Sequence, residues 1–324
     1  MKLEQITLPI KEDLERVEEV ISERLKSDVP FITTVTHYIT ENGGKRVRPA
    51  ILLLAARMAG YSGPSAIECA AAIEFCHTAT LLHDDVIDKA SLRRGRPSTN
   101  ARWGNHASVL IGDFFYCRAS EMFANSDNLK VIQLITKAMR ETTEGETLEI
   151  TKSNDLCITE EEYLKILHAK TAILIATAAE MGGLLGNVSE EFVRSLKEYG
   201  TSLGLAFQLA DDVLDYISDE ETFGKTRGID LREGKLTLPI ITALKQADPQ
   251  ETRMLKDALI SEKLEESKLK EIISLIQKLN GIDYTLNLAQ HYIAKAKGSL
   301  AVFKNSIEKE ALLNLADYVI CREK

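Results

Sequence analysis

The chain has 324 residues, of which 44% are hydrophobic and only 6% aromatic, so it is long enough to bury one large core. Its formal net charge of −9 at pH 7 argues against a nucleic acid as the main partner, because phosphate backbones select basic surfaces. An anionic small molecule is still compatible with this charge if metal ions and a few local cations neutralise it.

The cysteines and the N-terminal residues indicate a reduced intracellular setting. The five cysteines are an odd set whose spacings match no zinc or redox motif, which favours the cytosol. The first residues, MKLEQITLPIKEDLERVEE, become charged too early for a signal peptide. No apolar run approaches the roughly 20 residues of a membrane span. We therefore expect a cytoplasmic protein without stable membrane insertion.

Helical periodicity recurs along nearly the whole chain, and residues that favour helices dominate its composition. Turn signals stand at 42–44 and 61–64, a basic loop at 93–100 and a polar loop at 224–235. No segment predicts a convincing strand and no linker divides the chain, so we expect one all-α domain over residues 1–324. In chain order, helices are predicted over about 11–25, 50–58, 65–89, 101–125, 130–151, 159–185, 189–218 and, after more helix from 236 onward, 311–322.

Two Asp-Asp-x-x-Asp motifs lie near the ends of predicted helices, in HDDVID at 83–88 and ADDVLD at 210–215. The first and last carboxylates lie about 40° apart around a helix, so they share one face, and the middle one is within reach. Such clusters are unfavourable unless cations bind them, and oxygen ligands favour magnesium. A solvated acidic helix end would explain one motif, but two matched copies favour metal binding. The candidate ligands are Asp84, Asp85, Asp88, Asp211, Asp212 and Asp215.

Basic residues stand at positions suited to phosphate. GGKRVRP joins a glycine turn to a helix N-terminus, where Lys45 and Arg48 add charge to the helix dipole. Arg93 and Arg94 directly follow the first acidic motif, and a metal-bound diphosphate would bridge them to it. A basic helix start and a solvated turn are the plain alternatives.

Other candidate residues are weaker when taken singly. His77 precedes Asp84 by two helical turns and so shares its face, although a lone histidine on an apolar helix is usually structural. Lys170 with Thr171, and the lysines at 225 and 235, would each be surface residues if taken alone.

Together these residues resemble the trans-(E)-polyprenyl diphosphate synthase family, of the medium- to long-chain type, over nearly the whole chain. The resemblance rests on long blocks in family order: GGKRVRP, EFCHTATLLHDDVIDKASLRRGRPS, NARWGNHASVLIGDFF, LHAKTAILIATAAEMGG, FQLADDVLDYISDEETFGKTRGIDLREGKLTLPII and ALLNLADYVICREK.

The resemblance implies a fold, partners and roles. The fold is an isoprenoid-synthase-type helical bundle around a deep central cavity, usually a homodimer, with the two motifs facing each other and three magnesium ions held between them and the allylic diphosphate. Contact with a membrane surface is expected only for product release. By position, the allylic diphosphate is bound by Arg93, Lys170, Thr171, Gln208 and Lys225, and isopentenyl diphosphate by Lys45, Arg48, His77 and Arg94. The implied catalytic set is Asp84, Asp85, Asp88, Lys170, Thr171, Gln208 and Asp211.

The implied reaction condenses isopentenyl diphosphate successively onto an allylic diphosphate. Metal ions and cations stabilise the leaving diphosphate, which then serves as the base. Ala79 and Thr80, one turn before Asp84, are small, whereas bulky aromatic residues there stop chain growth early in this family. We therefore expect a product between hexaprenyl and decaprenyl, centred on octaprenyl, with a cavity floor set by side chains between Met122 and Ile135.

One departure and several rivals accompany the resemblance. The family often has Gly-Glu-x-x-Gln where this chain has Glu149 in the last position, so the role of that residue is open. A terpene cyclase would need a different second motif, and Ile158 stands where that motif requires Ser or Thr. A squalene-type synthase needs no isopentenyl pocket. A farnesyl or geranylgeranyl synthase, or a regulatory subunit of a heteromeric synthase, is the remaining alternative.

Overall fold

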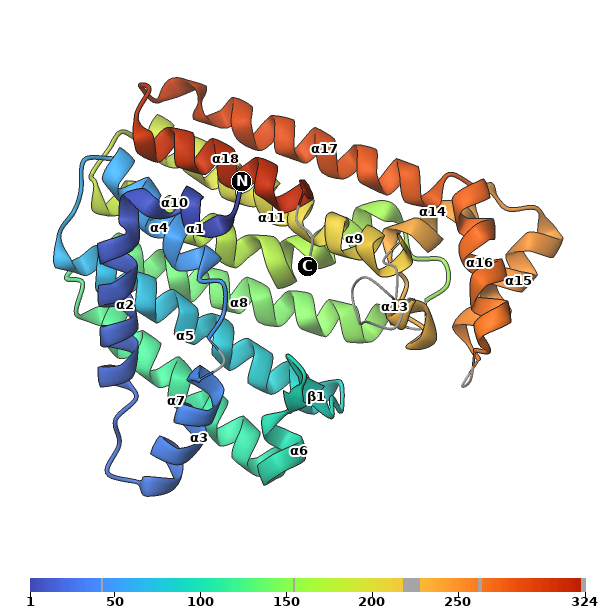
Figure 1. The fold of residues 1–324 in the computed structure, drawn as a ribbon, viewed down its shortest axis with the longest axis horizontal. Coiled ribbons are helices and arrows are strands. Elements are labelled where there is room, and N and C mark those ends of the chain that lie inside the picture. The colour runs from blue at the N-terminus through green and yellow to red at the C-terminus, as the bar shows by residue number, and fades with distance from the viewer. Residues whose placement is uncertain (42, 154, 218–227, 262–263, 322–324) are drawn as a thin grey trace. The chain divides into compact units, whose positions relative to one another are not determined.

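The structure is a computed structural model that describes residues 1–324 except 42, 154, 218–227, 262–263 and 322–324 (Figure 1). The described residues are mainly helical. Contacts between Cα atoms divide the chain into two compact units. The first comprises Met1–Met139, Leu174–Lys197 and Val302–Leu312, and the second Arg140–Ile173, Glu198–Ala301 and Leu313–Lys324.

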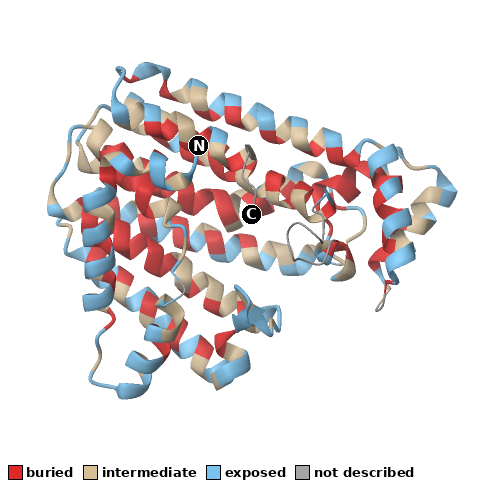
Figure 2. Ribbon diagram, in the orientation of Figure 1, coloured by how far each residue is buried: buried red, intermediate tan, exposed pale blue. Residues whose placement is uncertain are grey.

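The first unit contains the N-terminal helices and the first acidic motif. Helix α5 packs along α7, and Phe75 meets Phe115 edge to face with ring centroids 5.2 Å apart. Figure 2 shows α4 and α5 buried along much of their length. Its elements are α1 (Leu3–Ile6), η1 (Leu8–Ile10), α2 (Lys11–Arg24), α3 (Pro30–Thr40), α4 (Val47–Met58), α5 (Pro64–Ile87), β1 (Leu92–Arg93), β2 (Arg96–Pro97), α6 (Thr99–Trp103) and α7 (Asn105–Ala124).

The second unit contains the second acidic motif. Its core is built from apolar side chains of α9, α11, α14, α15, α16 and α17. Capping boxes at Thr159–Glu162 and Asp248–Glu251 satisfy the first N–H groups of α9 and α15. Its elements are α9 (Glu160–Leu167), η2 (His168–Ala172), α11 (Glu190–Ile217, which begins in the first unit), α13 (Ile229–Arg232), α14 (Leu238–Gln246), α15 (Pro249–Leu259), α16 (Glu266–Lys278) and α17 (Gly281–Ser299).

Four further elements complete the described chain. The unit boundaries fall inside α8, α11, η3 and α18, and near the start of α10. No helix in the described part of the chain is long and apolar enough to cross a membrane. The elements are α8 (Leu129–Lys152), α10 (Ile173–Leu185), η3 (Leu300–Val302) and α18 (Ile307–Cys321).

The predicted all-α class is confirmed, with several local differences. Helix α3 forms where no helix was predicted, and α13 forms within the predicted polar loop at 224–235. The expected continuous helix over 159–185 is interrupted by η2, a π-helical turn. The expected helix over 101–125 is two helices that break at Gly104, whose φ is 86°. The chain also forms a short β1–β2 hairpin where only a loop was predicted. The single domain and the central cavity stay predictions.

Candidate active site

The first acidic motif occupies the last turn of α5. Asp84 is half-buried, Asp85 is only 2% exposed, and Asp88 is the exposed C-cap residue. Asp85 Oδ1 accepts hydrogen bonds from Arg93 Nε at 2.9 Å and Arg93 Nη2 at 2.5 Å. The middle carboxylate is therefore held by an arginine, while Asp84 and Asp88 share one helix face at the negative end of the helix dipole.

A tight hairpin carries the arginines. Leu92 pairs with Pro97 and Arg93 with Arg96, so Arg94 and Gly95 are the two turn residues. Their φ angles are 51° and 76°, as in the mirror-image turns that suit hairpins. The segment that follows is tied back to the motif, because Asn100 Nδ2 donates to the Asp85 carbonyl at 3.0 Å. The hairpin thus fixes the arginines beside the first motif.

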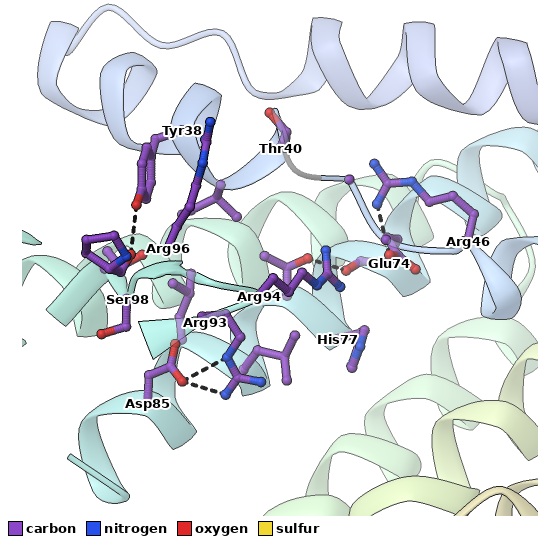
Figure 3. Close-up of a pocket in the computed structure, with 18 residues that line it drawn as sticks. Tyr38, Thr40, Arg46, Glu74, His77, Asp85, Arg93, Arg94, Arg96 and Ser98 are labelled. Carbon is purple, nitrogen blue, oxygen red and sulfur yellow. Dashed lines mark hydrogen bonds and ion pairs between the residues drawn. The ribbon is translucent and has the colours of Figure 1, made fainter. Parts of the chain in front are cut away.

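A cavity of about 80 Å³ opens beside this hairpin, and four arginines and two acids lie among its lining residues (Figure 3). Figure 3 shows Arg46 and Arg94 directed towards Glu74 from two sides. Arg46 Nη1 donates to Glu74 Oε1 at 2.9 Å, and Arg46 Nη2 donates to Glu18 Oε2 at 3.0 Å. Arg46 thus ties α2 to α5. The lining arginines are Arg46, Arg93, Arg94 and Arg96, and the acids are Glu74 and Asp85. The excess of cations suits an anion.

His77 lies in this cavity as a neutral group. Burial, followed by the charges of Arg48, Arg94, Arg93 and Arg46, lowers the pKa of the His77 imidazole well below its usual value. A neutral imidazole can donate one hydrogen bond to a phosphate oxygen without adding charge.

Arg48 lies in the first turn of α4, just after the left-handed residue Arg46, whose φ is 51°. Its Nε is buried and makes no hydrogen bond to any described group, and burial lowers the pKa of its guanidinium. A buried donor without a partner is costly, so Arg48 is suited to an external anion. Lys45 is exposed, and neither residue lines the described cavity.

The second acidic motif lies in α11 and uses its middle aspartate differently. Tyr163 Oη donates to Asp212 Oδ2 at 2.5 Å, and Gln208 Nε2 donates to Asp212 Oδ1 at 3.2 Å. Thr171 Oγ1 donates in turn to Gln208 Oε1 at 3.1 Å. Burial raises the pKa of Asp212 to about 8, against the two hydrogen bonds, which lower it.

The outer aspartates of the second motif are both half-buried. Asp215 accepts the backbone N–H groups of Ile229 and Asp230, each at 3.1 Å, and its carbonyl accepts Gly228 N–H at 2.9 Å. It therefore anchors the start of α13. Burial, with the nearby charge of Asp215, raises the pKa of Asp230 to about 6.

The π-helical turn η2 carries Lys170 and Thr171 at a point of close helix contact. A Cβ on Gly145 of α8 would lie 2.2 Å from Ala169 Cβ, and one on Gly204 of α11 would lie 2.4 Å from Ala172 Cα. Only glycine permits this approach. It brings Lys170 Nζ within 2.6 Å of Glu149 Oε2 and 3.2 Å of Glu146 Oε2.

The residues expected to set product length lie on α5. Ala79 is 2% exposed, and Thr80 donates its hydroxyl proton to the His77 carbonyl at 2.9 Å. One turn earlier, Cys76 lines a cavity of about 60 Å³. The rest of the lining comes from α7 and α8: Tyr116, Ser120, Phe123, Ile132, Ile135, Thr136 and Met139.

The acidic motifs suit divalent metal ions whose ligands come partly from the protein and partly from the substrate. Within the described residues, no group of three or more His, Cys, Asp or Glu could hold a metal ion by itself. Each motif instead offers outer carboxylates, an arrangement that suits magnesium because this ion keeps waters and substrate phosphates as ligands. Lys225 lies outside the described residues. The first motif lies in the first unit and the second motif in the second unit, and it stays a prediction that the two motifs face each other.

Several residues of the site were missed by sequence reasoning. Glu74 is the one acid in the apolar stretch 69–76 of α5, three residues before His77, and that pattern could have indicated it. Arg46 stands between two assigned cations. Tyr163 lies 49 residues from Asp212, and no local pattern predicts such a contact.

Comparisons with known proteins agree on one family. The family model described as polyprenyl synthetase matches residues 29–276. Octaprenyl diphosphate synthase from Escherichia coli (strain K12) is 41% identical over 324 residues, covering 100% of both chains. A polyprenyl synthase from Caulobacter crescentus CB15, solved with calcium and isoprenyl diphosphate, has 40% identity and a TM-score of 0.93, covering 99% of this chain and 98% of that one. A decaprenyl diphosphate synthase from Rhodobacter capsulatus has 38% identity and a TM-score of 0.94, covering 99% and 100%.

The chain therefore belongs to the polyprenyl synthetase family. The resemblance seen in the sequence, the all-α fold and the predicted prenyltransferase activity are confirmed.

Proposed function

We propose that this enzyme condenses isopentenyl diphosphate successively onto an allylic diphosphate to give an all-trans polyprenyl diphosphate, with octaprenyl as the product. The observation that carries the substrate class is the cavity beside the hairpin, whose four arginines exceed its two acids. A neutral His77 supports an anionic headgroup there, and Arg48 on α4, whose buried Nε makes no hydrogen bond to any described group, offers a further donor. We assign this headgroup to isopentenyl diphosphate, bound by Lys45, Arg48, His77 and Arg94.

The allylic diphosphate is assigned to Arg93, Lys170, Thr171, Gln208 and Lys225. Its carbon–oxygen bond breaks to give diphosphate and an allylic cation, and the electron pair leaves with the diphosphate. The Thr171 hydroxyl donates to Gln208, so its oxygen lone pairs stay available to the cation. The isopentenyl double bond then attacks the cation, and the proton lost from the adduct goes to the released diphosphate.

The proposed cofactor is magnesium, with three ions per active site. When bound, these ions neutralise the leaving diphosphate. Asp84 and Asp88 of the first motif and Asp211 and Asp215 of the second would hold them. Asp85 and Asp212 accept hydrogen bonds from Arg93 and Tyr163 respectively. Only the carboxylate lone pairs not used in these bonds would be available to the metal ions.

The product length is argued from α5. Ala79 adds little volume one turn before the first motif, and Cys76 lines a cavity further from it. A growing chain that passes Ala79 and Thr80 would meet the side chains around that cavity, of which Tyr116 and Phe123 of α7 and Met139 of α8 are the largest. We propose that they form its floor.

A homodimer, a cytoplasmic location and contact with membrane lipid at product release are also proposed. Val109, Leu110 and Tyr116 of α7 are 39%, 66% and 38% exposed, which suits a second copy of the chain. The described cysteines Cys69, Cys76, Cys117 and Cys157 are free, as expected in a reducing compartment.

The test is product analysis of the purified protein with farnesyl diphosphate, labelled isopentenyl diphosphate and magnesium, beside a chelator control. A ladder that ends near eight isoprene units, and that the chelator abolishes, is expected. Ala79→Phe should shorten the product by blocking the path, whereas Ala79→Ser, which keeps a small side chain, should not. Unchanged length in a folded Ala79→Phe variant contradicts the cavity argument. No condensation by the protein alone would favour a regulatory subunit.

A further inference from the structure

Lys170 is flanked by two carboxylates of α8. Its Nζ lies 2.6 Å from Glu149 Oε2 and 3.2 Å from Glu146 Oε2. The side chain of Glu146 is 19% exposed, and those of Lys170 and Glu149 are 31% and 36% exposed. One ammonium between two carboxylates leaves this cluster with a formal charge of −1.

This charge is opposite to that of the arginine-rich cavity, where cations exceed acids. Glu146, the more buried acid, carries one of the two negative charges beside Lys170. Glu149 carries the other, and it lies at the shorter distance from an ammonium group that is assigned to a diphosphate. An incoming diphosphate has to displace Glu149 from Lys170, and it is repelled by the carboxylate once this is displaced.

The pair is well placed for such an exchange. It is partly open to solvent, so breaking it does not strand a fully buried charge. The lysine comes from the π-helical turn, whose backbone is fixed by the close contacts at Gly145 and Gly204. The Lys170 side chain can therefore change partners while its backbone stays in place.

We propose that Glu149 sets the affinity for the allylic diphosphate by competing with it for Lys170. The inference rests on the proposed function of Lys170 and adds a positioning residue that weakens binding of the diphosphate headgroup. Each elongation cycle ends with one diphosphate leaving this site, so a competing carboxylate assists its release.

The test is Glu149→Gln, which removes the charge and keeps the shape. Farnesyl thiolodiphosphate and inorganic diphosphate are titrated into wild type and variant by calorimetry, with magnesium present. We expect roughly three- to fivefold tighter binding of both by the variant, as befits a partly exposed ion pair. The KM for farnesyl diphosphate should fall by a similar factor without a rise in kcat, and the difference should shrink in high salt.

Glu144→Gln is the matched control, because Glu144 lies on the same helix and pairs with Arg140 instead of Lys170. It should bind both probes as wild type does. The gain in affinity from Glu149→Gln should also shrink in a Lys170→Gln background, because the ammonium group for which carboxylate and diphosphate compete is then absent.

Equal or weaker binding by Glu149→Gln would overturn the inference, because Glu149 would then hold Lys170 in its binding position. So would a gain that persists undiminished without Lys170. Failure of the proposed function looks different: the wild type would then bind neither probe and form no product.

Discussion

The two acidic motifs have the same spacing, but the structure treats their middle aspartates in opposite ways. Asp85 forms an ion pair with Arg93, whereas Asp212 receives hydrogen bonds from the uncharged Tyr163 and Gln208. Burial raises the pKa of Asp212 to about 8, so near pH 7 it binds a proton in the metal-free protein. An identical pattern therefore gives the two middle carboxylates different surroundings, because the pattern specifies the carboxylates while tertiary packing supplies their partners.

The largest effects should come from the first aspartates, where the motifs are expected to be alike. Asp84→Ala and Asp211→Ala should each lower kcat by roughly 10³-fold or more, since each removes an oxygen ligand for the metal-bound diphosphate. Both side chains are half-buried, so both variants should stay folded by circular dichroism. Near-normal turnover in both would rule out the two-motif mechanism.

Smaller effects should separate the middle aspartates. Asp85→Asn replaces the ion pair with Arg93 by a hydrogen bond to an uncharged acceptor, and should cost about 10- to 100-fold in kcat/KM. Asp212→Asn keeps an acceptor for Tyr163, and a flip of the Gln208 amide restores the second bond because the Thr171 hydroxyl can accept as well as donate. The loss in kcat/KM for Asp212→Asn should stay within about tenfold. Equal losses in steady-state assays would mean that the two carboxylates have the same role.

The smallest effect should appear in the stability of the metal-free protein. Because the pKa of Asp212 is raised from its usual 3.8 to about 8, the folded chain keeps a proton that the unfolded chain loses. Its contribution to stability is fully present below about pH 4 and is lost as the pH rises to 8. Asp212→Asn has no such titration. Its free energy of unfolding, relative to that of the wild type, should therefore rise by about 1 kcal/mol or more between pH 5 and 8.

Thermal melts in chelator check this expectation, and each kcal/mol should appear as roughly 1–2 °C in Tm for a chain of 324 residues. A difference between Asp212→Asn and wild type that does not change with pH would contradict the raised pKa of Asp212.

Much of the fold was readable from the sequence because it depends on local periodicity. The helix predicted over 65–89 is α5, Pro64–Ile87, and both acidic motifs lie near helix ends as expected. The π-helical turn was not predicted, because the packing of Gly145 and Gly204 around it is set by residues far along the chain.

The candidate site was predictable in its residue types and less so in its partners. Arg93 was assigned from its position after the first motif, and it does contact Asp85. Glu149 was noticed only as a departure, since its contact with Lys170 spans 21 residues. Glu74 and Tyr163 act through tertiary contacts that no spacing rule contains.

The anchoring of α13 by Asp215 has a consequence for hydrogen exchange. The Asp215 carboxylate, which accepts the N–H groups of Ile229 and Asp230, is also an expected metal ligand. Metal binding and formation of the short helix α13 are therefore thermodynamically linked. Magnesium together with a diphosphate should therefore slow amide exchange at Ile229 and Asp230, and Asp215→Ala should abolish that protection together with the helix start.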